Sequence, residues 1–219
     1  SMFMGSRIRG LMAGMCLMLS ALLSMQASAA TILIVGDSIS AAYGMDIRQG
    51  WVSLLEQRLQ RQSATHQVIN ASVSGETTSG GLQRLPRLLR QHRPDLVVLE
   101  LGGNDGLRGQ PPALMQRNLE RMVRLTQAGG GRVIVAGMRI PPNYGRAYTD
   151  AFAAVFPAVA RSTGSALVPF LLDGVGGRPE YMQADGLHPN VRAQALILKQ
   201  VWPVLERELR QVEARRVQS

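Results

Sequence analysis

The sequence predicts an α/β domain in which a parallel sheet lies between helices on both of its faces. From residue 30 onward, short runs rich in β-branched residues alternate with segments of helical periodicity. The strand candidates are apolar throughout and do not alternate with polar residues. Such runs are typical of parallel strands that are buried on both faces. Five of these alternations fit within one domain.

The expected elements follow in chain order. Five apolar runs are expected to form strands at residues 32–35, 67–69, 96–101, 133–136 and 166–168. Apolar residues at helix spacing predict helices around residues 51–59, 82–89, 115–123, 147–161 and 190–205. Asn190 is expected to cap the start of the last helix, and Pro203 is expected to kink or divide it.

Residues 1–29, which begin with a tag residue, are expected to be a secretory signal peptide. Arg7 and Arg9 form a basic start, residues 11–25 are nearly all apolar, and residues 27–29 read Ala-Ser-Ala, a pattern that signal peptidases cleave. The apolar run is short for a membrane span. We therefore expect a protein exported to the periplasm.

Residues 30–209 are expected to form a single domain, followed by a polar tail at 210–219 that frays. Cys16, the only cysteine, lies in the leader, so the mature chain has neither a disulfide nor a catalytic thiol. Without the leader the formal net charge is +7, carried mainly by scattered arginines. Because these form no basic run with interleaved aromatics, we expect no nucleic-acid binding. The positive charge allows at most transient contact with a membrane surface, and a monomer is the default expectation.

Polar residues next to glycines follow three of the predicted strands, and an acid and a histidine precede the last helix. Ser38 stands in GDSIS, Gly75 in NASVSGETTSGG and Asn104 in GGND, while Asp185 and His188 stand in DGLHP. Parallel sheets bind ligands beyond the carboxyl ends of their strands. We therefore expect these groups to converge at one edge of the sheet.

These residue types suit acyl transfer to a serine. The Ser38 hydroxyl needs a base to become a nucleophile, and His188 can supply one if Asp185 holds its ring from the other side. The backbone N–H groups of Ser38 and Gly75, together with the Asn104 amide, could stabilise an oxyanion. Each motif alone is also compatible with a turn or a helix cap, but their combination indicates catalysis.

The four blocks resemble those of the SGNH hydrolases, the GDSL-type esterase superfamily. The residues that give this superfamily its name stand here as Ser38, Gly75, Asn104 and His188. Asp185 completes the triad, and the resemblance extends over about residues 31–205, with Ile39 in place of the usual leucine. It implies a flavodoxin-like, three-layer α/β/α fold and hydrolysis without a metal or other cofactor. Within the superfamily it is similar to bacterial periplasmic thioesterases, arylesterases and lysophospholipases, which implies an acyl ester, acyl thioester or lysophospholipid as substrate.

Two loops beyond the third and fourth predicted strands are candidates for the acyl-binding surface. Leu107 and Arg108 lie in the first loop, and Pro141 and Tyr144 lie in the second. Both loops are flanked by proline or glycine and come from the edge where the site is expected. Arg108 is equally compatible with capping its own loop.

Other functions were compared with this hypothesis. An α/β-hydrolase would carry Gly-x-Ser-x-Gly, which is absent, and a two-metal site would need several histidines, whereas His66 and His92 are interpreted as surface residues. A carbohydrate O-acetylesterase of the same superfamily remains an alternative. A flavin- or nucleotide-binding module is the alternative from a different class, although residues 41–43 replace the phosphate-binding loop that it would need.

Overall fold

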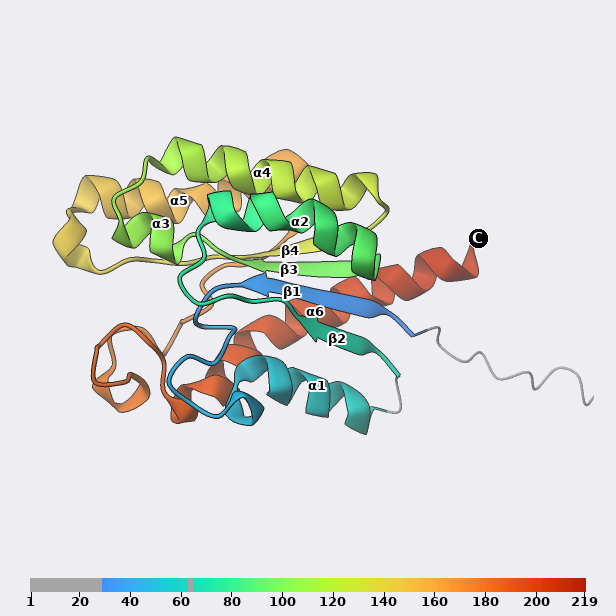
Figure 1. The fold of residues 1–219 in the computed structure, drawn as a ribbon, viewed down its shortest axis with the longest axis horizontal. Helices are drawn as coiled ribbons and strands as arrows, with labels where there is room; N and C mark the ends of the chain where they lie inside the picture. The colour runs from blue at the N-terminus through green and yellow to red at the C-terminus, as the bar shows by residue number, and fades with distance from the viewer. Residues whose placement is uncertain (1–28, 63–64) are drawn as a thin grey trace, which may run out of the picture.

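The structure, a computed structural model, describes residues 29–62 and 65–219. The predicted leader, except for Ala29, therefore lies outside the described residues. One sheet contains five parallel strands in the order β2-β1-β3-β4-β5 (Figure 1). The strands are β1 (Thr31–Gly36), β2 (Gln67–Asn70), β3 (Leu96–Glu100), β4 (Arg132–Ala136) and β5 (Ala166–Val168). This is the flavodoxin-like strand order, so the predicted fold class is confirmed.

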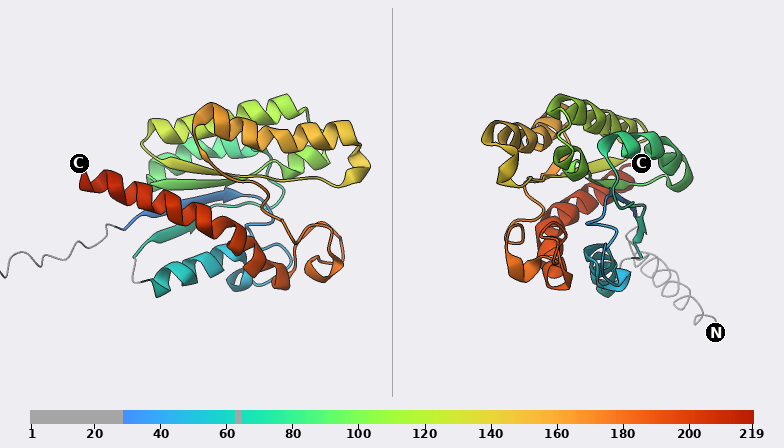
Figure 2. Two further views of the ribbon diagram at one scale, coloured as in Figure 1. Left: turned by 180° about the vertical axis from the view of Figure 1, so that it is seen from behind. Right: turned by 60° about the vertical axis from the view of Figure 1, so that its left-hand side comes forward.

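Helices cover both faces of the sheet, which makes the three layers (Figures 1 and 2). One face carries α1 (Trp51–Arg61) and α6 (Gln194–Val217). The other face carries α2 (Thr78–His92), α3 (Gly103–Leu107), α4 (Pro112–Ala128) and α5 (Arg146–Thr163). Short 3-10 turns lie in the connections at Ile47–Gln49, Pro142–Tyr144, Pro179–Tyr181 and Val191–Ala193. None of the helices in the described part of the chain is long and apolar enough to cross a membrane.

The core lies where the apolar periodicity predicted it. All of β3 is buried, and β1 is buried except at Thr31, because helices pack on both sides of the central strands. Each helix turns its apolar stripe inward, as Trp51 and Leu55 of α1 and Phe152 and Phe156 of α5 illustrate. Apart from α3 and the two ends of α6, the predicted strands and helices therefore match the observed ones to within about five residues.

The C-terminal helix differs from the prediction. The residues predicted to fray continue α6 as far as Val217, and Pro203 does not end the helix. Val212 is buried on the core side, and Arg216 donates to the Ala29 carbonyl oxygen at 2.7 Å and pairs with Asp95 at 2.7 Å. These contacts hold the polar tail in place, and a composition argument cannot see them.

The starts of two elements also differ from expectation. Asn190 precedes the 3-10 turn Val191–Ala193, and α6 proper begins only at Gln194. The Asn190 amide donates to the Glu180 carbonyl oxygen at 2.9 Å and makes no cap bond. Gly103 and Asn104, which the sequence placed in a loop, begin α3, and Gly102 before them has a φ of 124° that disfavours any side chain.

The strand order reverses between β1 and β3, which lie side by side with Gly36 opposite Glu100. From β1 the chain goes on to the outer strand β2, whereas from β3 it goes on to β4 on the other side. The loops that leave β1 and β3 therefore diverge at the carboxyl ends of these strands, which is where parallel sheets of this kind bind their ligands. Ser38 and Asn104 lie in these two segments, and the C-terminal end of α6 lies at the opposite edge of the sheet (Figure 1).

Candidate active site

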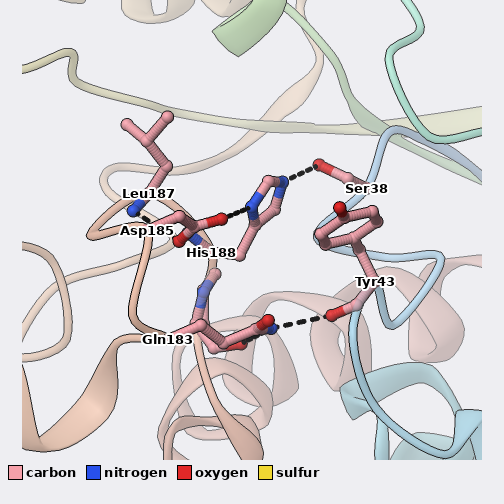
Figure 3. Close-up of polar contacts among 7 residues, drawn as sticks. Ser38, Tyr43, Gln183, Asp185, Leu187 and His188 are labelled. Carbon is pink, nitrogen blue, oxygen red and sulfur yellow. Dashed lines mark hydrogen bonds and ion pairs between the residues drawn. The ribbon is translucent and has the colours of Figure 1, made fainter.

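The three predicted triad residues meet at this edge (Figure 3). Nε2 of His188 lies 3.0 Å from the Ser38 hydroxyl oxygen, and Nδ1 of the same ring is in hydrogen-bond contact with the Asp185 carboxylate. A neutral imidazole in this position donates from Nδ1 and accepts at Nε2. The Ser38 hydroxyl can therefore donate its proton to the ring, which is the geometry of an activated nucleophile.

The turn Asp185–His188 fixes the acid relative to the ring. One Asp185 oxygen accepts from the backbone N–H groups of Leu187 at 2.9 Å and His188 at 3.0 Å, which leaves the other oxygen for the imidazole. Gly186 makes the reversal possible with a φ of 70°. The imidazole contact and the two N–H donors lower the pKa of Asp185 to about 2, so this carboxyl is ionised at neutral pH.

A tight turn after β1 presents Ser38. The Asp37 carbonyl oxygen accepts from the Ala41 N–H at 2.9 Å, and its carboxylate accepts from the Ile39 N–H at 3.0 Å. The Tyr43 N–H donates to the Ser38 carbonyl oxygen at 3.0 Å. The backbone on both sides of the nucleophile is therefore held in place, while the Ser38 side chain remains accessible to the imidazole.

Two backbone donors near the nucleophile are unused by the described residues. Within residues 29–62 and 65–219, neither the Ser38 N–H nor the Gly75 N–H donates to a protein acceptor. Gly75 has a φ of 81°, and a β-carbon at this position would meet open space. Glycine is favoured here by the backbone conformation and not by a close neighbour. Both N–H groups are thus available to an added oxygen.

Asn104 links the loops that carry these donors. Its amide nitrogen donates to the carbonyl oxygen of Glu76, the residue after Gly75, at 3.0 Å. It also lies 3.5 Å from the carboxylate of Asp37, the residue before Ser38. The second contact is long, so the second amide hydrogen is only weakly engaged. The structure therefore brings all the predicted oxyanion donors to one edge.

The two predicted acyl-binding loops contact each other. The Tyr144 hydroxyl donates to the Leu107 carbonyl oxygen at 2.8 Å, and the Tyr148 hydroxyl donates to the Gln110 carbonyl oxygen at 2.5 Å. Leu107 is half-buried at the end of α3, as are Pro141 and Tyr144 in their segment. Arg108 is exposed, and its side chain makes no hydrogen bond or ion pair with the described residues.

The sequence-based prediction missed two residues, Tyr43 and Gln183, that link the segment of Ser38 to the segment of His188. The Tyr43 ring lies beside the His188 ring with centroids 4.3 Å apart (Figure 3). Gln183 donates to the Tyr43 carbonyl oxygen at 2.7 Å and to the Pro189 carbonyl oxygen at 3.0 Å, which joins the nucleophile segment to the histidine segment. The contacts of Tyr43 with His188 and with Gln183 link distant parts of the chain, so local patterns gave no signal for them.

A second missed feature is a pair of buried acids behind the nucleophile turn. Glu100 ends β3 with none of its surface exposed, and Asp37 is only 3% exposed. Burial raises the pKa of both carboxyl groups, and the neighbouring Asp37 raises the pKa of Glu100 further. A signal was present in the sequence, because Glu100 is a lone acid at the end of a strand expected to be buried on both faces.

His66, outside the predicted triad, has a structural role. The His66 side chain is 4% exposed, so its interpretation as a surface residue is wrong. Its Nδ1 accepts from the Ala30 N–H at 2.9 Å at the start of β1, which explains its burial. Within the described residues, no group of three or more histidine, cysteine or acidic side chains is arranged to hold a metal ion.

Curated relatives and solved structures resemble this chain over most of its length. Esterase TesA of Pseudomonas aeruginosa is 53% identical, covering 91% of this chain and 98% of its own. The thioesterase 1/protease 1/lysophospholipase L1 of Escherichia coli K12 is 42% identical, covering 85% and 91%. The crystal structure of a psychrotrophic esterase, EstA, from Pseudoalteromonas, inhibited by monoethylphosphonate, superposes with a TM-score of 0.79 at 41% identity, covering 83% of this chain and 99% of that one.

The model of the GDSL-like lipase/acylhydrolase family matches residues 34–196. This match begins within β1 and ends in the first turn of α6, so it includes all five strands and every predicted catalytic block. The strand order, the nucleophile turn and the relatives agree with it. The chain belongs to the GDSL-like lipase/acylhydrolase family.

Proposed function

We propose that this protein hydrolyses carboxylic esters and thioesters through an acyl-enzyme on Ser38. The observation that carries the proposal is the distance of 3.0 Å between the Ser38 hydroxyl oxygen and Nε2 of a His188 ring that Asp185 holds from behind. The printed names of the relatives, which include an esterase and a thioesterase, agree in reaction type. A flavin- or nucleotide-binding module would have no use for this triad.

The reaction proceeds in two steps. His188 takes the proton of Ser38 while the hydroxyl oxygen attacks the acyl carbonyl, and the resulting imidazolium returns the proton to the leaving alcohol or thiol. Water then enters, gives its proton to His188, and attacks the Ser38 ester. The resulting tetrahedral adduct then collapses, His188 returns the proton to the Ser38 oxygen, and the carboxylic acid is released. The Asp185 carboxylate stabilises the imidazolium in both steps.

Each step passes through a tetrahedral intermediate with a negative oxygen. We assign the N–H groups of Ser38 and Gly75 and the Asn104 amide as its donors. The N–H groups of Ser38 and Gly75 have no protein acceptor among the described residues. The Asn104 amide contacts Asp37 and Glu76, the chain neighbours of these two residues. Removing one such donor costs about 2.7–4 kcal/mol of transition-state stabilisation. The three donors are therefore assigned to the negative charge that develops on the acyl oxygen only during the reaction.

The acyl chain is assigned to the surface formed by the segments around Leu107 and Tyr144, with Pro141 beside them and Arg108 at the exposed edge. The bond from the Tyr144 hydroxyl to the Leu107 carbonyl oxygen holds the two segments together. Small-molecule acyl esters, acyl thioesters and lysophospholipids are the proposed substrates. The leader in the sequence supports export, and we propose a monomer acting in the periplasm, with at most transient contact with a membrane surface.

Labelling with a fluorophosphonate tests the nucleophile. The probe is expected to modify the wild-type protein on Ser38, and Ser38→Ala is expected to lose both labelling and esterase activity. Ser162→Ala, an exposed serine on α5, is the matched control and should label normally. Labelling of another serine in Ser38→Ala would refute the assignment. A panel of acyl thioesters, aryl esters, a lysophospholipid and an acetylated sugar would then define the substrate class.

A further inference from the structure

Two buried acids behind the nucleophile turn have no part in the triad mechanism. Glu100, at the end of β3, has no exposed surface, and it lies opposite Gly36 in the neighbouring strand. A β-carbon at Gly36 would come within 2.9 Å of the nearer Glu100 oxygen, so the glycine leaves room for this side chain. Buried ionised acids are strongly destabilising unless they are paired, so a pair of acids here needs an explanation.

The contacts of Glu100 use only one of its oxygens. Oε1 accepts from the Ser40 N–H at 3.1 Å and from the Ser40 hydroxyl at 2.7 Å. The Trp51 indole N–H in turn donates to the Ser40 hydroxyl oxygen at 3.1 Å. Oε2 is buried and has no hydrogen-bond partner among the residues that the structure describes. Glu100 thus holds the nucleophile turn with one oxygen and leaves the other without a donor.

The neighbouring acid explains the unused oxygen. The Asp37 N–H donates to Oε1 of Glu100 at 3.4 Å, and the interaction between the two carboxyl groups raises the pKa of Glu100 and lowers that of Asp37. Asp37 is itself an acceptor, from the Ile39 N–H at 3.0 Å and, at the longer distance of 3.5 Å, from the Asn104 amide. In the described part of the chain, the charge of His188 also acts on the pair, because it lowers the pKa of Asp37. Two acids this close cannot both be ionised, and one proton between them completes the hydrogen bonding.

We propose that Asp37 and Glu100 share a single proton, carried by Oε2 of Glu100 and donated to the Asp37 carboxylate, and that this pair positions the nucleophile turn. The proton is assigned to Oε2 of Glu100 because this oxygen accepts no hydrogen bond, whereas each Asp37 oxygen accepts one, from the Ile39 N–H and, at 3.5 Å, from the Asn104 amide. Asp37 directly precedes Ser38 and accepts from the N–H of Ile39, the residue after Ser38. Its carboxylate also contacts the Asn104 amide. Loss of the proton at alkaline pH would leave two adjacent charges and loosen this arrangement.

An infrared measurement tests where the proton resides. At neutral pH the wild-type protein is expected to show the carbonyl-stretch band of a neutral carboxylic acid, and Glu100→Gln is expected to lose it. Glu56→Gln, which replaces an exposed acid on α1, is the matched control and should keep the band. No such band in the wild-type protein, or a band lost in Asp37→Asn but kept in Glu100→Gln, would overturn the proposal.

Activity tests the positioning role. Glutamine mimics a protonated Glu100, because its oxygen can accept from Ser40 and its amide can donate to Asp37. Methionine has a similar size but does neither, so Glu100→Met should lower kcat about tenfold or more. Glu100→Gln should retain most of the wild-type kcat. It should also lack the decline of kcat/KM at alkaline pH that the proposal predicts for the wild-type protein. Equal losses in the two variants, or an unchanged alkaline decline, would refute the positioning role.

Asp37→Asn gives an independent arm. The charged Asp37 accepts on both oxygens, whereas asparagine has one oxygen for the Ile39 N–H and the Asn104 amide. We therefore expect a larger loss of kcat in Asp37→Asn than in Glu100→Gln, and the reverse order would place the proton on Asp37. The kinetic arm rests on the proposed hydrolase function, but the infrared band needs no substrate, so the two can fail separately.

Discussion

Asp185→Asn isolates the role of the acid in the triad. In the wild-type protein one Asp185 oxygen accepts from the N–H groups of Leu187 and His188, and the other accepts from Nδ1 of the ring. If the asparagine oxygen keeps the two backbone donors, its amide must face Nδ1. The ring then carries its proton on Nε2, where it points at the Ser38 hydroxyl and cannot accept from it.

The size of the loss follows from these contacts. A locked, wrong tautomer costs about 10,000-fold in kcat in a serine protease. The asparagine can escape by rotating its amide, but it then gives up two backbone hydrogen bonds at about 1 kcal/mol each. A rotated form that is less stable by about 2 kcal/mol still costs about 30-fold. We therefore expect a loss between about 30-fold and 10,000-fold.

The assay is kcat for an aryl ester, measured beside the thermal unfolding midpoint. Asp185→Asn should keep the midpoint close to that of the wild-type protein because the turn retains its backbone bonds. Asp185→Ala removes those bonds as well and should be the less stable variant. Asp173→Asn, which alters another exposed acid, is the control. A loss of less than about fivefold in a stable Asp185→Asn would refute the tautomer argument.

Three further predictions concern the surroundings of the triad. Asn104→Ala should lower kcat by about 100- to 1,000-fold while KM changes little, and an unchanged kcat would remove this amide from the oxyanion site. Tyr144→Phe breaks the bond to the Leu107 carbonyl oxygen and should change the acyl-length preference by a few-fold, measured as kcat/KM over a series of esters, whereas an unaltered series would argue against an acyl surface there. For Glu100, the unfolded chain releases its proton near the ordinary pKa of 4.5, whereas the folded protein retains it at higher pH. The free energy of unfolding of the wild-type protein, relative to that of Glu100→Gln, should therefore fall as pH rises above about 4.5, by at most about 1.4 kcal/mol per pH unit. The fall should stop once Glu100 ionises in the folded state. If denaturant unfolding gives the same difference in free energy of unfolding at every pH, this prediction is wrong.

Local sequence was sufficient where a contact joins neighbours in the chain. Asp185 and His188 are three residues apart, and the glycine between them signalled the turn that makes them meet. Ser38 and Asn104 were also expected at one edge of the sheet, where the structure places them, because each follows an apolar strand and parallel strands end at the same edge. In these cases a short-range pattern and one rule of sheet topology sufficed.

Prediction failed where a contact joins distant segments. His66 looked like a surface residue, yet it is buried because its ring accepts from the backbone of Ala30. The polar tail was expected to fray, yet Arg216 fixes it to Asp95, which lies directly before β3. Neither the distance between two such groups nor their burial is encoded in residue type or in periodicity, so the sequence offered no means of detecting them.

The order of strands and helices and the chemical groups available for acyl transfer were determined by the sequence itself, because apolar periodicity and turn residues act over a few positions. Only the tertiary structure decided which partners those groups have: the Tyr43 ring beside His188, the bond between Tyr144 and Leu107, and the Asp37–Glu100 pair. The physical reason is that hydrogen bonding and the desolvation of charge depend on distances between segments that only the packed chain brings together.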